Sequence, residues 1–140
     1  MHRSCLYPVT FLLLLSCNNH FHQSRAVVKQ QTAVIRNYIQ AEDTRDSLQL
    51  KALLADTIAC YWKMEDPGKR KIIDFYKDYW TKNRYSKNTI QSVTAIAKNT
   101  YRVQTFFEVQ RMQADTAIHV QSTIVYTLNA GNKIVCIGKE

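Results

Sequence analysis

The spacing of hydrophobic residues changes once along the chain, near Lys87. Before Lys87 the apolar residues recur every three or four positions, as in helices that bury one face, and after it they alternate as in strands. The first pattern predicts a helix over residues 27–41 and a shorter one over residues 48–55. We therefore expect a helical first half and a sheet in the second half.

A third helix is predicted after a short strand. Residues 57–62 are rich in β-branched and aromatic side chains, as strands are, and residues 65–68 include a Pro-Gly pair that favours a turn. The helix that follows should end by fraying over residues 82–86. Its buried face should consist of Ile72, Ile73, Tyr76, Tyr79 and Trp80.

The alternating half predicts four strands, over residues 89–97, 100–112, 117–128 and 133–139. Short turns between them make the strands antiparallel. The face that the helices would cover carries Tyr101, Val103, Thr105, Phe107 and Val109, beside Val120, Ser122, Ile124, Tyr126 and Leu128. The other face is polar apart from Phe106 and Val125, and it is either solvated or paired with a second copy. His119 lies on that outward face, where we expect it to be incidental.

The first residues have the pattern of a secretory signal, with a basic start, an apolar stretch at 6–15 and a small-residue end. The ending Leu14-Leu15-Ser16-Cys17 resembles the lipobox of bacterial lipoproteins, in which Cys17 would carry the lipid. The chain would then divide into a signal peptide (1–16), a lipidated Cys and tether (17–25), and one domain (26–140). The protein would be exported and anchored through Cys17 to a bilayer, at the periplasmic face of a bacterial membrane or at the cell surface. The alternative is an ordinary secretory peptide.

Length and charge narrow the classes of protein. With 140 residues, 46% of them hydrophobic, the chain has room for a single globular domain. Its apolar run is about half of the roughly 20 residues that a membrane-spanning helix needs, which argues against a polytopic membrane protein. The net charge of +8 is concentrated on the third helix, where it either attracts anionic groups or marks a solvated face.

Several kinds of chemistry lack their usual motifs in this sequence. It contains no Gly-rich phosphate loop, no paired Cys-x-x-Cys and no nucleophile elbow. We therefore expect no cofactor and no metal, and we expect no nucleic-acid partner for an exported protein. The carboxylates Asp56 and Asp66 have the placement of a helix end and a turn, so structural roles are favoured for both.

The order helix, short helix, strand, helix and antiparallel meander resembles the nuclear transport factor 2-like superfamily. Short segments support the resemblance: 34–39 in the first helix, 53–56 at the end of the second and 72–76 in the third. The resemblance implies a cystatin-like α+β roll, in which three N-terminal helices pack on a curved, mostly antiparallel sheet. It spans residues 26–140 and implies the fold more strongly than an activity.

The enzymes of that superfamily include ketosteroid isomerase and polyketide cyclases, which use the cone between helices and sheet as an active site. By resemblance, Tyr38 matches the tyrosine of the isomerase, which donates a hydrogen bond to the developing oxyanion. The positions of its general base and second acid fall at Trp62 and near Ile124. Neither residue can move a proton, so an isomerase of that kind is disfavoured.

The cone would be lined by aromatic rings, which suit a flat or greasy ligand. The candidate pocket residues are Tyr38, Trp62, Tyr76, Tyr79, Trp80, Tyr101, Phe107 and Tyr126. Our preferred hypothesis is a non-catalytic binding module for a small apolar or mixed ligand that the sequence does not identify. A cyclase-like or dehydratase-like enzyme would instead need a buried acid or base beside Tyr38. A third hypothesis is an interaction protein with a ring-filled cone and a homodimer through the outer sheet face.

Cys60 and Cys136 are the cysteines of the domain itself. They are either two buried thiols or a disulfide formed in an oxidising compartment. The resemblance allows the second option, because the early strand and the last strand run side by side in that superfamily.

Overall fold

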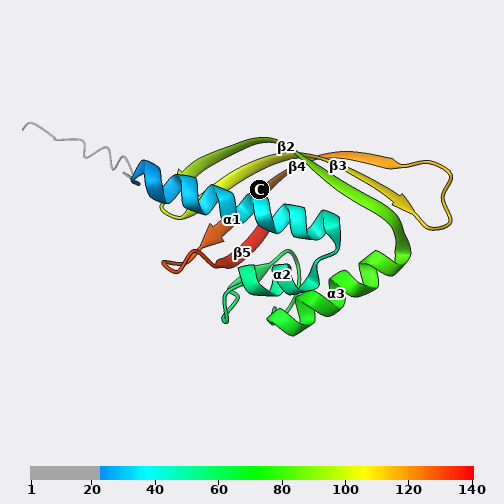
Figure 1. Ribbon diagram of the computed structural model, residues 1–140, viewed down its shortest axis with the longest axis horizontal. Helices are drawn as coiled ribbons and strands as arrows, with labels where there is room; N and C mark the ends of the chain where they lie inside the picture. The colour runs from blue at the N-terminus through cyan, green and yellow to red at the C-terminus, as the bar shows by residue number, and fades with distance from the viewer. Residues whose placement is uncertain (1–22) are drawn as a thin grey trace, which may run out of the picture.

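The protein, seen in a computed structural model that describes residues 23–140, is a curved sheet with helices on one side (Figure 1). The signal peptide and Cys17 lie outside the described residues. The elements of the described part are α1 (Arg25–Thr44), α2 (Ser47–Leu53), β1 (Cys60–Tyr61), α3 (Lys69–Lys82), β2 (Asn83–Ala97), β3 (Thr100–Arg111), β4 (Ile118–Leu128) and β5 (Ile134–Lys139). None of these helices is long and apolar enough to cross a membrane.

The sheet has the strand order β1-β5-β4-β3-β2, with β1 parallel to β5 and the other pairs antiparallel. The predicted inner face is confirmed in its central part, where Tyr101, Val103 and Thr105 of β3 are buried beside Tyr126 and Ile124 of β4. Val120, which was predicted to be covered, is 41% exposed, because the helices do not extend over that end of the sheet. The predicted α+β fold, with three helices on a mostly antiparallel sheet, is confirmed as well.

The first helix runs three residues further than the apolar spacing predicted. The Ser24 hydroxyl caps its start by accepting a hydrogen bond from the Val27 amide, and Arg45 in the left-handed region ends it. The extra turn contains Glu42 and Asp43, which are polar and so gave no apolar signal. Both nevertheless face other elements: the Asp43 carboxylate accepts hydrogen bonds from the Asn88 amide and side chain at 2.9–3.0 Å.

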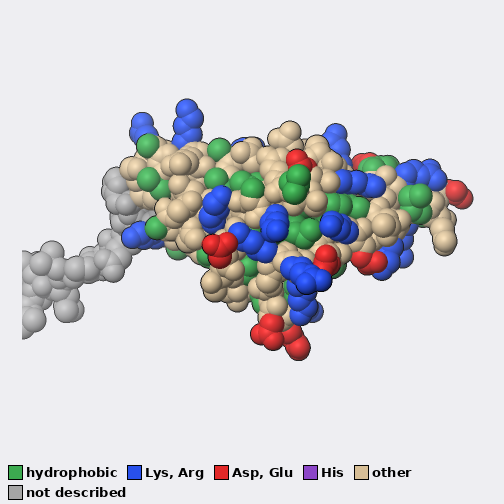
Figure 2. All heavy atoms as spheres, turned by 60° about the horizontal axis from the view of Figure 1, so that its bottom comes forward, with side chains coloured by type: hydrophobic (Ala, Val, Ile, Leu, Met, Phe, Trp, Pro, Cys, Tyr) green, Lys and Arg blue, Asp and Glu red, His purple; other side chains and the backbone are tan. Residues whose placement is uncertain are grey.

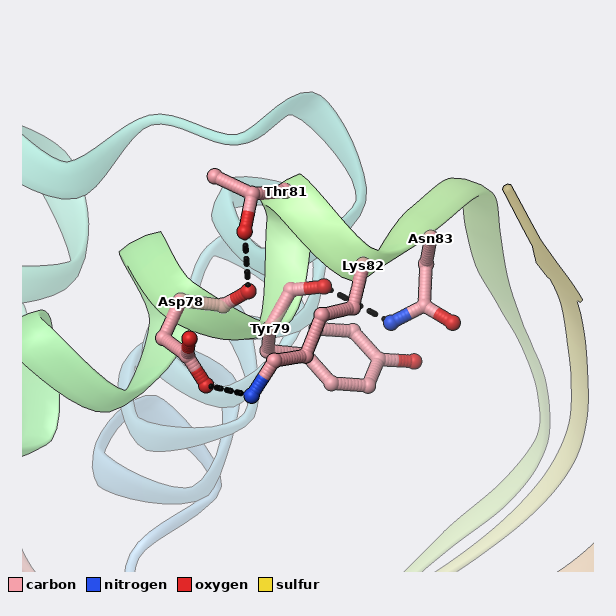
Figure 3. A network of polar contacts seen from close by, with 5 residues as sticks. All are labelled: Asp78, Tyr79, Thr81, Lys82 and Asn83. Atoms are coloured by element: carbon pink, nitrogen blue, oxygen red, sulfur yellow. Dashed lines mark hydrogen bonds and ion pairs between the residues drawn. The ribbon is translucent and has the colours of Figure 1, made fainter. Parts of the chain in front are cut away.

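The predicted fraying at the end of α3 is wrong, because the helix passes directly into β2. Figure 3 shows the reason: the Asn83 side chain donates a hydrogen bond of 2.7 Å to the carbonyl of Tyr79. On the preceding turn Lys82 pairs with Asp78 at 2.6 Å, and the Thr81 hydroxyl donates to the Asp78 carbonyl. The helix end is therefore held by side-chain hydrogen bonds, and β2 begins directly at Asn83.

The strand predicted over residues 57–62 is shorter than expected, with only Cys60 and Tyr61 in regular pairing. Trp62 ends it, because its backbone has a positive φ of 51°. The Trp62 amide still donates a hydrogen bond of 2.7 Å to the carbonyl of Ile137 in β5. This turn directs the chain away from β5 and places Trp62 beside α3.

The space between α1 and the sheet is closed by side chains that satisfy one another. Tyr38, Tyr101 and Tyr126 have no more than 1% of their surface exposed. The Tyr101 hydroxyl donates a hydrogen bond of 2.8 Å to Gln31, whose amide in turn donates to Asn99 at 3.0 Å. We call this part of the interior the closed half.

Candidate ligand-binding cavity

Beneath α3 the interior is open and forms a cavity of about 500 Å³. Its walls come from the end of α1, the turn after β1, one side of α3 and the inner face of the sheet. A volume of this size is typical of a small-molecule site. The lining residues are Glu42, Tyr61, Trp62, Lys63, Met64, Phe75, Tyr76, Tyr79, Trp80, Ser86, Asn88, Thr105, Phe107, Ser122 and Ile124.

Five of the eight predicted pocket residues line this cavity: Trp62, Tyr76, Tyr79, Trp80 and Phe107. The other three, Tyr38, Tyr101 and Tyr126, do not line it and lie in the closed half instead. Their place follows from α1, which lies across that part of the sheet (Figure 1). Tyr38 belongs to α1, and all three rings are buried. Trp62 and Ile124 both reach the cavity, so the positions that the resemblance assigns to two acids hold apolar side chains here.

Three residues of the cavity wall each carry a buried polar atom that has no hydrogen-bond partner among the described residues: the Tyr79 hydroxyl, the Trp80 ring nitrogen and the Thr105 hydroxyl. Thr105 is fully buried and Trp80 is 8% exposed. Ser86 lies near Tyr79 and partly offsets the rise in the pKa of Tyr79 that burial causes. The two side chains nevertheless do not have the geometry of a hydrogen bond. Buried polar groups are almost always paired, so this concentration of unpaired ones needs an explanation.

A chain of hydroxyl groups leads from the closed half to the cavity and ends at a carboxyl group. The hydroxyls of Tyr38 and Tyr61 are 2.7 Å apart, and Tyr61 donates to Tyr76 at 2.8 Å. Tyr76 donates in turn to Oε1 of Glu42. Each hydroxyl has one proton, so this order requires Tyr38 to donate to Tyr61, and all three O–H bonds point toward Glu42.

Glu42 is a half-buried side chain in an apolar setting, and its chemistry changes accordingly. Burial raises the pKa of the Glu42 carboxyl to about 8, although the hydrogen bond from Tyr76 lowers this pKa in part. Asp43, the next residue, raises it a little further. Burial also raises the pKa of Tyr38, Tyr61 and Tyr76, so these hydroxyls stay protonated near neutral pH.

The sequence analysis missed Glu42 and Tyr61, and a signal was present for Glu42. Glu42 follows Tyr38 by four residues and Ile35 by seven, so it shares the buried face of α1. In a regular strand Tyr61 would face away from Trp62, but the positive φ of Trp62 breaks the alternation and both residues line the cavity. Glu42 is a half-buried acid near Tyr38, where the enzyme hypothesis required a buried acid or base.

Cys60 and Cys136 are direct partners in the parallel pairing of β1 with β5, with Cα atoms 4.5 Å apart, and the structure joins them in a disulfide. The side-by-side placement that the resemblance implied is therefore present. The bond ties β1, which carries Tyr61 of the hydroxyl chain, to the edge of the sheet.

Other residues singled out in the sequence lie away from the cavity. Asp56 is exposed and pairs with Lys69 at 2.7 Å, and Asp66 has a positive φ of 44° in its turn. His119 is stacked on Phe106 at the outer face, with ring centres 5.6 Å apart. A homodimer through that face stays a prediction.

The basic helix keeps part of its charge unpaired. Lys and Arg side chains gather on the side where α2 and α3 lie (Figure 2). Two of them pair with acids of α3 itself, Arg70 with Asp74 at 3.8 Å and Lys82 with Asp78. Exposed pairs of this kind contribute little to stability, so the helix presents a mainly solvated basic face.

Comparison with known proteins places this architecture among solved structures. No family model and no curated protein matches the chain. A protein of unknown function from Burkholderia pseudomallei, described as nuclear transport factor 2-like, aligns with a TM-score of 0.69 and 13% identity over 79% of this chain and 89% of its own. The Δ5-3-ketosteroid isomerase of a Mycobacterium species aligns with a TM-score of 0.66 and 16% identity over 79% and 92%.

A third neighbour was solved with a ligand. The Mycobacterium tuberculosis protein RV0760c, in complex with estradiol-17β-hemisuccinate, aligns with a TM-score of 0.66 and 13% identity over 79% of this chain and 92% of its own. The class is thus an α+β protein whose helices and sheet enclose a pocket. More particularly, the chain has the nuclear transport factor 2-like fold. At identities this low, the structural similarity establishes the fold only. The activity has to be argued from the residues of the cavity.

Proposed function

We propose that this chain is a lipid-anchored protein that binds a small, flat, mainly apolar molecule in the cavity beneath α3. The observation that supports the proposal most strongly is the set of unpaired polar atoms on Tyr79, Trp80 and Thr105, in a wall that carries seven aromatic residues. A ligand with an apolar body and two or more oxygen atoms would bury the rings, and it would pair these groups once their side chains rotate toward it.

The chemistry of the wall narrows the ligand further. The Trp80 ring nitrogen can only donate a hydrogen bond, so it requires an acceptor such as a carbonyl or ether oxygen. Glu42 is mostly protonated at neutral pH, so it favours an uncharged group beside it. The mycobacterial neighbour of the same fold was solved in complex with a steroid ester, which supports a flat, mainly apolar body for the ligand.

The anchor at Cys17 is part of the proposal, and the shape of the domain supports it. The described chain begins at the end of α1 that lies far from α3 (Figure 1). A lipid at Cys17, followed by a short tether, would leave the cavity away from the point of attachment. Metabolic labelling with palmitate tests this part: the wild-type chain should take up label, and Cys17→Ser should not.

Tryptophan fluorescence provides a direct binding test, because Trp62 and Trp80 are the two tryptophans of the chain and both line the cavity. Titration of the domain with estradiol-17β-hemisuccinate as the probe should change the emission when tryptophan alone is excited. Ser122→Phe puts a ring into the cavity and should abolish the change. Thr123→Phe is the matched control, since the next residue of β4 faces the outer side of the sheet, and it should leave the response intact.

A further inference from the structure

The inner face of the sheet continues beyond the cavity as a second hollow. Tyr79 and Phe107 belong to the walls of both the cavity and a groove of about 650 Å³, so the two spaces adjoin. The groove lies where the β3–β4 hairpin extends past the end of α3 (Figure 1). Its floor includes Val109 and Ile118, which are direct partners in the pairing of β3 with β4. A molecule longer than the cavity would therefore continue along this groove.

Apolar side chains in the groove are exposed to solvent. Ile118 is 48% exposed, and Met112, from the turn after β3, is 53% exposed. Apolar side chains that gather on a concave surface usually mark a binding site. Tyr79, which carries one of the unpaired hydroxyl groups, stands in the wall that the two spaces share. The groove therefore offers an apolar surface to the same molecule that occupies the cavity.

One end of the groove is basic. Lys82 and Arg111 line it, and backbone hydrogen bonds hold this part of the chain in place. Arg111 is the direct partner of Asn83 in the pairing of β2 with β3, and the Met112 amide donates a hydrogen bond of 3.0 Å to the Lys82 carbonyl. Arg111 follows Phe107 by four residues, which is about 14 Å along a strand. The positive charge therefore lies at the end of the groove away from the cavity.

Arg111 is the more available of the two cations. Lys82 is already paired with Asp78 of α3 at 2.6 Å, whereas Arg111 forms no ion pair within residues 23–140. No Asp or Glu of that range lines the groove. The groove thus combines an apolar floor with an uncompensated positive charge, which is complementary to a molecule with an apolar body and an anionic end.

We propose that the groove binds the carboxylate group of an elongated molecule whose apolar body occupies the cavity, with Arg111 as the principal partner of the carboxylate. This inference rests on the proposed function and deepens it, because it assigns the ligand a negative charge at one end. A guanidinium presents its N–H donors in one plane, so it can donate hydrogen bonds to both oxygens of a carboxylate.

The two ends of the ligand would meet opposite electrostatic settings. Burial raises the pKa of the Glu42 carboxyl to about 8, so this group is mostly uncharged at neutral pH and favours a neutral group beside it. The Arg111 guanidinium favours an anion in the groove. The bound molecule therefore has one preferred direction, with its neutral end beneath α3 and its carboxylate beyond Phe107 along β3. Lys63, which lines the cavity from the turn after β1, is the competing cation.

A matched pair of ligands tests the charge directly. Estradiol-17β-hemisuccinate carries a carboxylate on a short arm, and estradiol is the same flat body without the arm. Tryptophan fluorescence should show that the protein binds the ester about 5- to 10-fold more tightly than estradiol, because one charge-assisted contact is added at a partly exposed site. This ratio of affinities should fall as the ionic strength rises to about 1 M, since salt screens exposed charges.

Arg111→Gln should bind the ester no more tightly than estradiol. Its affinity for estradiol should stay close to that of the wild type, which would also show that the variant is folded. Arg84→Gln is the matched control, because Arg84 is an exposed residue of β2 that lines neither the cavity nor the groove. This control removes the same charge and should keep the preference for the ester. Lys82→Gln should reduce the preference by less than Arg111→Gln, because Lys82 is already paired with Asp78.

Three results would overturn this inference and leave the proposed function in place. Equal affinities of the wild-type protein for the two steroids would show that the charge is not recognised. Loss of the preference in Lys63→Gln, but not in Arg111→Gln, would place the carboxylate beside the turn after β1. Displacement of the ester by succinate alone at similar concentrations would make the groove a site for free anions. A wild-type protein that responds to neither steroid would instead contradict the proposed function, and this inference with it.

Discussion

The closed half and the cavity lie on one face of the sheet and contain the same kinds of side chain, but they differ in whether their buried polar atoms are hydrogen-bonded. In the closed half the Tyr101 hydroxyl is paired with Gln31, and Gln31 with Asn99. In the cavity the polar atoms of Tyr79, Trp80 and Thr105 stay unpaired. An unpaired buried group lowers the stability of the fold, so its presence in the cavity alone is consistent with the ligand site proposed above.

The border between the two regions offers the largest expected effect. The Cys60–Cys136 disulfide spans 76 residues of sequence and ties the strand that carries Tyr61 to β5. The double variant Cys60→Ala/Cys136→Ala should lower the free energy of unfolding by about 3–4 kcal/mol. Without the bond, the unfolded chain gains the conformational entropy that the closed loop had removed. Urea denaturation measures the loss. Non-reducing mass spectrometry of the exported protein that found two free thiols would contradict this prediction.

The next prediction concerns how the free energy of unfolding depends on pH through Glu42 of the cavity. Native Glu42 keeps its proton up to about pH 8, whereas in the unfolded chain its pKa is near the usual 4.5. Between these values the folded state binds the additional proton, so the free energy of unfolding falls as pH rises, by about 2–4 kcal/mol, and levels above 8.

Urea denaturation at several pH values, compared between wild type and Glu42→Gln, isolates this contribution. In the variant the free energy of unfolding should decrease much less as the pH rises, and above pH 8 the variant should be more stable than the wild type. Parallel curves for the two proteins would mean that Glu42 titrates normally, and the cavity would then lose its distinct electrostatic character.

A smaller effect is expected from breaking a pair in the closed half. Tyr101→Phe removes the hydroxyl that donates to the buried Gln31 side chain and leaves the ring in place. The free energy of unfolding should fall by about 1–2 kcal/mol, with ligand binding unchanged. Thermal or urea denaturation measures the stability, and the fluorescence titration measures the binding. Weakened binding at unchanged stability would contradict the assignment of Tyr101 to the part of the interior that stabilises the fold.

The smallest effect has the opposite sign. Thr105→Val replaces the unpaired hydroxyl in the cavity with a methyl group of nearly the same shape. The variant should gain about 1 kcal/mol of stability because a buried unpaired group is removed, and it should bind the steroid ester more weakly. A loss of stability would indicate that the hydroxyl already has a partner in solution, such as an ordered water molecule.

The fold could be predicted from the sequence because alternation along β3 and β4 determines which side chains face inward. Alternation does not say which inward residues are covered, since Tyr101 and Phe107 look alike in such a pattern. That depends on where α1 ends and α3 crosses the sheet. Glu42 was missed for a related reason: a charged residue at the end of a helix resembles solvated surface until the tyrosines from β1 and α3 are placed around it.

Native mass spectrometry tests the central claim, that the space beneath α3 is a ligand site, most directly. The chain that begins at residue 17, with Cys17→Ser, would be purified gently from its own host. We predict an extra mass that is lost on denaturation and is absent from Ser122→Phe. A bare mass for the wild-type chain, with a crystal structure in which the Trp62 and Trp80 rings fill the cavity, would contradict the account.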